Sequence, residues 1–335
     1  MKRFIKSAIY FFISFILILL VIYLIGIYGI EATSYYKLPN DTKYVVFGDS
    51  HSECAFNDSL IDNFANFANS GEAFFYTYLK ARKLIPKNKQ IEVVFIEYSN
   101  NQITKEIDNW IWDDVYLPIR LPTYLPLMDY SDLRLLMDNN PNMFRNQIVK
   151  SVLKNISYNY RTIAFKRNCL KNSIRFGGYF FRTKSVVDSL ILSPNVKLGK
   201  KNHQTISKLN IKYLEKTIKL CEKYNKQVIL IRPPVHIMSV SLNNDDEYKR
   251  ILINRFRNID YIDFQNYPLK NIGFYDFDHL NSYGATEFSI WFNILISKGL
   301  LEVTEKQSFV NEEIKYERTT AKYPQVGQLT SLKGN

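Results

Sequence analysis

Residues 45–53 read Val45-Val46-Phe47-Gly48-Asp49-Ser50-His51-Ser52-Glu53. The apolar run that ends at Phe47 predicts a short buried strand, and Gly48 permits a tight turn because it has no Cβ atom. Asp49 and Ser50 are good N-cap residues, so we expect a helix to begin here. Ligands of open α/β sheets bind at this edge of a strand. A hydroxyl at Ser50 would lie near free backbone N–H groups, which suits a nucleophile, although Gly-Asp-Ser also forms ordinary turns.

A histidine late in the chain can supply the base that a serine nucleophile requires. Residues 274–281 read Phe-Tyr-Asp-Phe-Asp-His-Leu-Asn, in which Asp276 and His279 are three residues apart. One short turn can present both side chains together, so that Asp276 orients the imidazole ring of His279. Asp278 adjoins the histidine but is expected to point elsewhere. His236 is the reserve candidate for the base.

These two motifs, Gly48-Asp49-Ser50 and Asp276-x-x-His279, together resemble the SGNH/GDSL hydrolase superfamily. The resemblance is strongest to its membrane-anchored bacterial branch, which includes polysaccharide O-acetyltransferase and D-alanyl-transfer proteins, and it covers roughly residues 43–300. It implies a flavodoxin-like three-layer sandwich with a parallel sheet. It also implies a serine esterase or O-acyltransferase that works through an acyl-Ser50 intermediate on a cell-envelope or exported polysaccharide, with no metal and no organic cofactor.

The same resemblance implies an oxyanion hole. In the family it is formed by the nucleophile's own N–H, by a glycine after the second strand and by an asparagine after the third strand. Here these correspond to Ser50, Gly71 and either Asn100 or Asn101. The usual Gly-x-Asn-Asp of the third block is replaced by Ser99-Asn100-Asn101-Gln102, so the choice between the two asparagines stays open.

The chain from residue 43 onward alternates strand and helix patterns, which predicts a parallel sheet with helices on both faces. Strands are expected at 43–47, 63–69, 91–98, 227–231 and 259–264, and helices at 72–85, 204–224, 245–256 and 282–297. We therefore expect one domain at 43–304.

A long interruption between the third and fourth strands predicts an insertion at about residues 102–203. Its first part contains Trp110 and Trp112, and 132–171 is expected to be helical. The aromatic residues could stack on sugar rings, pack the insertion onto the sheet or face a membrane interface. The polar residues 305–335 show no periodicity and predict an irregular tail.

The first part of the chain predicts a membrane anchor. Residues 7–30 contain no charged side chain, and as a helix they would be ~36 Å long, enough to cross a bilayer. Basic residues precede this stretch and Glu31 follows it, so residues 1–6 should be cytoplasmic. A cleavable signal peptide is the alternative, but no Ala-x-Ala site follows. We expect a single-pass protein of the bacterial inner (cytoplasmic) membrane, with a linker at 31–42 and a periplasmic or extracytoplasmic domain.

The net charge of the chain bears on which partners it can bind. The net charge is +12, from 44 basic and 32 acidic residues, yet no basic helix or known nucleic-acid-binding signature is evident. Nucleic acid is also a poor partner for an exported domain, whereas anionic lipid or an acidic glycan fits the charge.

The chain contains three cysteines, Cys54, Cys169 and Cys221. They are too few, and odd in number, for a disulfide framework. Cys54 is expected to be buried packing and not a nucleophile.

The sequence also bears on functions other than that of an esterase. The Gly-x-Ser-x-Gly motif of α/β-hydrolases is absent. A metallophosphoesterase would need more histidines at set spacings; its ligands would be Asp49, His51, Asp276, Asp278 and His279. His51 is instead expected to line the wall of the site. The main alternative is a catalytically inactive, membrane-anchored scaffold of a polysaccharide-modifying complex. Expected partners are a glycan or other acyl-ester substrate and a multi-spanning membrane acyltransferase.

Overall fold

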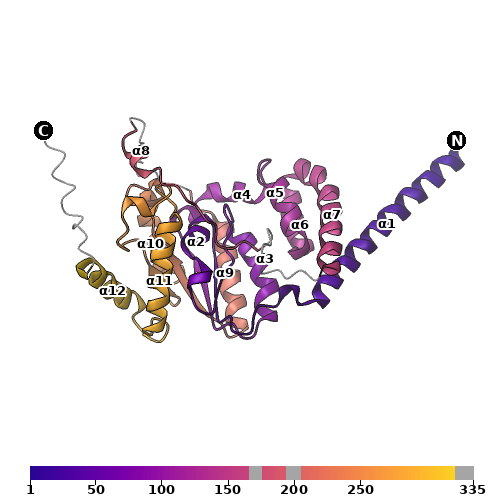
Figure 1. Ribbon diagram of the computed structural model, residues 1–335. Helices are drawn as coiled ribbons and strands as arrows, with labels where there is room; N and C mark the ends of the chain where they lie inside the picture. Colours follow the sequence, from indigo (N-terminus) through magenta and orange to yellow (C-terminus); the bar gives the residue numbers. More distant parts are fainter. Residues whose placement is uncertain (166–175, 194–204, 321–335) are drawn as a thin grey trace.

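The computed structural model describes residues 1–165, 176–193 and 205–320 (Figure 1). Within these residues five strands form one all-parallel sheet in the order β2-β1-β3-β4-β5. The strands are β1 Tyr44–Phe47, β2 Phe64–Asn66, β3 Val93–Glu97, β4 Gln227–Arg232 and β5 Asp260–Asp263. The predicted α/β class with a parallel sheet is confirmed. The strand order is that of flavodoxin-like doubly wound sheets, which bind ligands between β1 and β3.

Different helices bury the two faces of the sheet. Val46 and Phe95 belong to one core, whereas Phe47 and Ile96 belong to the other, because successive side chains of a strand point to opposite faces. The first core also receives residues of α2 Ser50–Ala55, α11 Ser282–Ser297 and α12 Lys306–Thr320. The second receives residues of α3 Phe74–Leu84, α9 Lys208–Lys223 and α10 Asp245–Arg255.

The C-terminal region differs from the predicted irregular tail, since α12 forms at Lys306–Thr320. Val310 and Ile314 are buried. The side chain of Gln307 accepts a hydrogen bond from Asp263 N–H (2.6 Å) and donates one to Asp263 O (3.2 Å). The helix thus covers the edge strand β5, whose backbone groups would otherwise lack partners. Residues 321–335 lie outside the described residues.

The insertion is mostly helical. Its helices are α4 Asn109–Trp112, α5 Leu117–Tyr124, α6 Tyr130–Asn139, α7 Pro141–Ala164 and α8 Val187–Ile191. The predicted helix at 132–171 is broken between Asn140 and Pro141, where Asn140 caps α7. Trp110 and Trp112 pack against the second core. Of the three roles considered for these aromatic residues, the structure therefore shows the packing of the insertion onto the sheet.

Short 3-10 helices connect the longer elements along the chain. They occur at Ser34–Tyr36, Asp58–Leu60, Ile85–Lys87, Asn100–Ile103, Lys105–Asp108, Leu125–Leu127, Val240–Asn244 and Asn271–Gly273.

The N-terminal helix α1 spans Lys2–Ala32 and projects away from the domain (Figure 1). It has 31 residues, and an 18-residue stretch of it has a mean hydropathy of 3.0, so it is long and apolar enough to cross a membrane. Its last part packs against α7 at Gly26 and Gly29; a Cβ atom added at Gly29 would lie 2.7 Å from a methyl group of Ile163. The linker that follows also packs onto the domain, because Tyr35 and Tyr36 are buried.

Candidate active site

Ser50 lies where β1 ends and α2 begins, as the sequence predicted. Gly48 directly after the strand is required by close packing: a Cβ atom there would lie 2.4 Å from Oε2 and 2.6 Å from Cβ of Glu97. The Asp49 side chain caps α2 by accepting a hydrogen bond from His51 N–H. Ser50 itself is partly exposed.

The structure joins Ser50, His279 and Asp276 in one hydrogen-bonded chain. Nε2 of His279 lies 2.8 Å from Oγ of Ser50. Nδ1 of the same ring lies 2.8 Å and 3.0 Å from the two carboxylate oxygens of Asp276. Residues that are 229 positions apart thus take the arrangement of nucleophile, base and orienting acid.

The Asp276 carboxylate also shapes the turn that presents His279. Its Oδ1 atom accepts hydrogen bonds from the N–H groups of Asp278 and His279, both at 2.9 Å. Tyr275 N–H donates to His279 O (2.8 Å) and closes the turn. Burial alone would raise the pKa of Asp276, but the hydrogen bond and charge of His279 outweigh it, so the pKa lies below its ordinary value. Asp276 is therefore ionised at neutral pH and suited to orient the imidazole.

The other candidates for the acid and the base lie elsewhere. Asp278 accepts a hydrogen bond from Ser239 and points away from the ring of His279, as expected. Both ring nitrogens of His236 are engaged, one with Asn271 Oδ1 and the other with Met238 N–H, each at 3.2 Å. Among the described residues, Asp276, Asp278 and His279 do not join Asp49 and His51 in one group close enough to hold a metal, so the five ligands considered for a metallophosphoesterase do not converge. His203, the fourth histidine of the chain, lies outside the described residues.

The backbone N–H of Ser50 is available for the oxyanion hole that the family resemblance implies. Three of the four first-turn N–H groups of α2 have partners: His51 donates to Asp49 Oδ1, Ser52 to Glu97 Oε2 and Glu53 to Asp49 O. The fourth, that of Ser50, has no acceptor among the described residues.

Gly71, after β2, has a φ of +66°, a conformation that favours glycine. Arg120 of α5 donates hydrogen bonds to the carbonyl groups of both Ser70 and Gly71. Because C=O and N–H point in opposite directions across a trans peptide bond, the Gly71 N–H points away from Arg120. Arg120 of the insertion therefore holds the loop after β2 in place from one side. The Gly71 N–H points to the opposite side of that loop.

The two asparagines after β3 have different surroundings. Asn100 is buried; its amide donates to Asn244 Oδ1 and its oxygen accepts from Arg232, both at 3.0 Å. Asn101 is partly exposed, and its amide donates to Asp49 Oδ2 at 2.6 Å, next to Ser50. An amide carries two N–H bonds. Asn101 is therefore the asparagine whose amide lies beside the nucleophile's turn.

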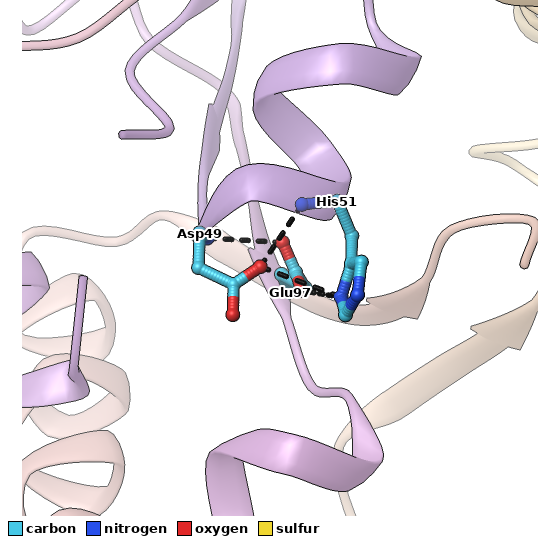
Figure 2. Close-up of side chains that lie close together, drawn as sticks. All are labelled: Asp49, His51 and Glu97. Carbon is cyan, nitrogen blue, oxygen red and sulfur yellow. Dashed lines mark hydrogen bonds and ion pairs between the residues drawn. The ribbon is translucent and has the colours of Figure 1, made fainter. Parts of the chain in front are cut away.

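Beneath Ser50 lies a buried cluster of Asp49, His51 and Glu97, whose side chains point toward one another (Figure 2). Nδ1 of His51 lies 3.0 Å from Glu97 Oε1 and 3.4 Å from Asp49 Oδ1. Glu97 Oε2 accepts hydrogen bonds from the N–H groups of Asp49 and Ser52, both at 3.0 Å. The ring centroid of His51 lies 5.4 Å from that of His279. His51 therefore lines the site, and Glu97 holds together the turn that carries Ser50.

The charges of this cluster follow from its burial. Burial and the nearby Glu97 carboxylate raise the pKa of Asp49 to about 7. Burial alone would lower the pKa of His51, but the two carboxylates outweigh it and raise this pKa to about 10. Burial likewise opposes ionisation of Glu97, yet the hydrogen bond from His51 holds its pKa well below its usual value. One ligand atom from each residue lies within 4.8 Å of the others. The carboxylate oxygens of Asp49 and Glu97 already accept hydrogen bonds from backbone N–H groups, and His51 Nδ1 already faces Glu97 Oε1. These contacts fit a hydrogen-bonded network better than a metal site.

A segment of the insertion passes along the other side of α2. Gly178 N–H donates to Ala68 O (3.0 Å) and Phe180 N–H to Glu53 O (2.9 Å). The guanidinium of Arg182 then lies over the ring of Tyr275, 4.7 Å from its centroid, and donates from Nε to Sγ of Cys54 (3.2 Å). This segment therefore forms one wall of the site between α2 and the Asp276–His279 turn.

The profile of an uncharacterised protein family matches residues 183–301. The match includes Asp276 and His279 but not Ser50. No curated protein matches the chain.

The roles of Glu97 and of the segment around Arg182 in the site were not predicted from the sequence. An ionisable residue at the carboxyl end of an otherwise apolar central strand was a detectable signal, because a buried charge requires a partner. Nothing in the sequence around Arg182 indicated that it contacts α2.

Proposed function

We propose that this protein is a membrane-anchored serine esterase or O-acyltransferase of the SGNH type. The observation that carries the proposal is the chain of hydrogen bonds from Asp276 through His279 to Ser50, with 2.8 Å between Ser50 Oγ and His279 Nε2. The strand order of the sheet and the position of Ser50 at the end of β1 support the same proposal. The substrate class, an acyl ester of a cell-envelope or exported polysaccharide, comes from the family resemblance.

In the proposed reaction Ser50 Oγ attacks the ester carbonyl carbon while His279 Nε2 takes the hydroxyl proton. The negative charge that develops on the carbonyl oxygen is stabilised by the N–H groups of Ser50 and Gly71 and by the amide of Asn101; one such donor is typically worth ~10²–10³ in rate. The intermediate then expels the alcohol, which receives the proton from His279. Water or a sugar hydroxyl, deprotonated by His279, then attacks the carbonyl carbon of the acyl-Ser50 ester. The bond from this carbon to Ser50 Oγ breaks, and Oγ takes the proton back from His279, which restores the enzyme.

The cellular arrangement follows from the anchor. With α1 in the bacterial inner membrane and its basic N-terminus in the cytoplasm, the α/β domain lies on the extracytoplasmic side. A multi-spanning acyltransferase in the same membrane is the proposed acyl donor if the reaction is a transfer.

A serine-directed fluorophosphonate tests the nucleophile. The full-length protein in detergent should be labelled at Ser50, as located by peptide mass spectrometry, and Ser50→Ala should not be labelled. The full chain is required because removal of α1 would expose side chains of the domain that pack against it. Labelling at another serine, or none in a folded protein, would contradict the assignment. An inactive scaffold would also let Ser50→Ala complement a deletion strain fully, whereas the proposed enzyme would not.

An acetyl-ester assay with and without an acceptor glycan separates the two reactions. An esterase should release acetate at the same rate in both cases. A transferase should move the acetyl group to the glycan and release less acetate when the glycan is present.

Cys54 is predicted to be dispensable. Burial raises the pKa of its thiol to about 12, although Arg182 opposes this, so the group is not a thiolate at neutral pH. Cys54→Ala should keep ester hydrolysis within a few-fold of the wild-type rate, while Ser50→Ala should abolish it. A collapse of activity in Cys54→Ala with an unchanged circular dichroism spectrum would instead indicate a role for the thiol.

A further inference from the structure

Helix α7 of the insertion carries basic residues but no acidic one. Its 24 residues include Arg145, Lys150, Lys154 and Arg161, and all four side chains are exposed. They supply four of the net +12 charges of the chain. In the sequence these basic residues are interspersed with many apolar ones, so no basic helix was predicted.

The exposed face of α7 is also apolar along one stripe. Val149, Leu153 and Tyr160 are 60%, 48% and 40% exposed. At 3.6 residues per turn these three side chains lie within about 40° of one another around the helix axis. By the same geometry Arg145 lies about 40° from the stripe on one side, and Lys150 and Lys154 lie about 60° and 100° from it on the other. A helix with an apolar stripe flanked by lysine and arginine is typical of helices that lie in a membrane interface.

The contact between α7 and α1 determines the depth at which α7 lies relative to a bilayer that α1 spans. Tyr160 Oη donates to Ile22 O at 3.4 Å, and a Cβ atom added at Gly26 would lie 3.3 Å from Cβ of Asn159. The uncharged stretch of α1 ends at residue 30, and about 20 residues suffice to cross the hydrocarbon core. The contact therefore lies at the boundary between membrane and water. Figure 1 shows α5, α6 and α7 on the side of the domain where α1 projects.

We propose that α7 lies on the surface of the bilayer that α1 spans, and that this surface contains anionic phospholipid. Val149, Leu153 and Tyr160 enter the interface, and the basic side chains bind lipid phosphates. The absence of acidic residues from α7 matches a negatively charged surface, and the stripe continues directly from the α1–α7 contact. The inference rests on the proposed membrane anchor but not on the proposed ester chemistry.

The test places a spin label at Leu153→Cys in the full-length protein, in lipid nanodiscs that contain phosphatidylglycerol and phosphatidylcholine. All labelled variants also carry Cys169→Ser, which removes one native thiol. Cys54 and Cys221 are buried and their thiol pKa values are raised, so they react slowly with the spin-label reagent. The ratio of accessibility to oxygen over a water-soluble nickel chelate should be several-fold higher at residue 153 than at Glu312→Cys on α12. A label at Ile13→Cys reports whether α1 itself is embedded.

Two matched charge reversals test the role of the lysines. Lys150→Glu/Lys154→Glu should lower the ratio at residue 153 several-fold, whereas Lys208→Glu/Lys212→Glu, an exposed pair on α9 with the same spacing, should leave it unchanged. Nanodiscs of phosphatidylcholine alone should also lower the ratio. The proposal would be overturned if the label at residue 153 were as accessible to the nickel chelate as the label at residue 312. This holds whether or not the label at residue 13 shows α1 to be embedded. An equal ratio in both lipids would overturn the requirement for anionic lipid.

Discussion

Replacing His279 with alanine should lower kcat for hydrolysis of a soluble acetyl ester by about 10⁴-fold or more, because the members of a catalytic triad act as a unit. Without the imidazole, no group within hydrogen-bonding distance of Ser50 Oγ in the described residues can take the hydroxyl proton. The initial rate of acetate release by the full-length protein in detergent measures the effect. Fluorophosphonate labelling of Ser50 should be lost in parallel.

His236→Ala is the matched control. Its ring is engaged with Asn271 and Met238 and not with Ser50, so the rate should change by no more than a few-fold. Asp276→Asn should lower kcat strongly but less than His279→Ala, since a Ser–His pair retains some activity. An active His279→Ala together with an inactive His236→Ala would show that the loop after β4 supplies the base.

Glu97→Gln should destabilise the folded protein by about 3 kcal/mol, the scale seen when one partner of a buried ion pair is removed. The carboxylate accepts hydrogen bonds from Asp49 N–H and Ser52 N–H and faces the ring of His51. A glutamine keeps the size but replaces one acceptor oxygen with a donor, so at least one buried group loses its partner. Thermal unfolding of the full-length protein, followed by circular dichroism, measures the loss as a lower Tm.

Glu92→Gln provides the control for this change. Glu92 lies just before β3, its side chain is 55% exposed, and it pairs with Lys43 at 3.0 Å. Exposed ion pairs contribute less than about 1 kcal/mol, so its Tm should stay close to that of the wild type. Equal melting of the two variants would show that the buried cluster does not stabilise the turn of Ser50.

Local patterns were sufficient for the elements of the sheet. The apolar runs around Val46, Phe95 and Ile229 predicted strands of a parallel sheet, because a strand buried on both faces must be apolar throughout. The spacing of Asp276 and His279 likewise predicted that one turn would present both side chains. The α12 helix was missed because its buried face consists of only a few apolar residues, and it is stabilised by packing on β5.

The sequence by itself determined the parallel α/β sheet, the apolar helix α1 and the three residues Ser50, Asp276 and His279 as candidates. Only the tertiary structure decided that these three side chains meet, since 229 residues separate Ser50 from His279 and no local pattern encodes their distance. It also showed that the amide of Asn101, and not that of Asn100, lies beside the turn of Ser50, because Asn100 contacts Arg232 of β4 and Asn101 contacts Asp49, the N-cap of α2. The physical reason is the same in each case: short-range patterns report backbone conformation and burial, whereas hydrogen-bond partners depend on how distant segments pack.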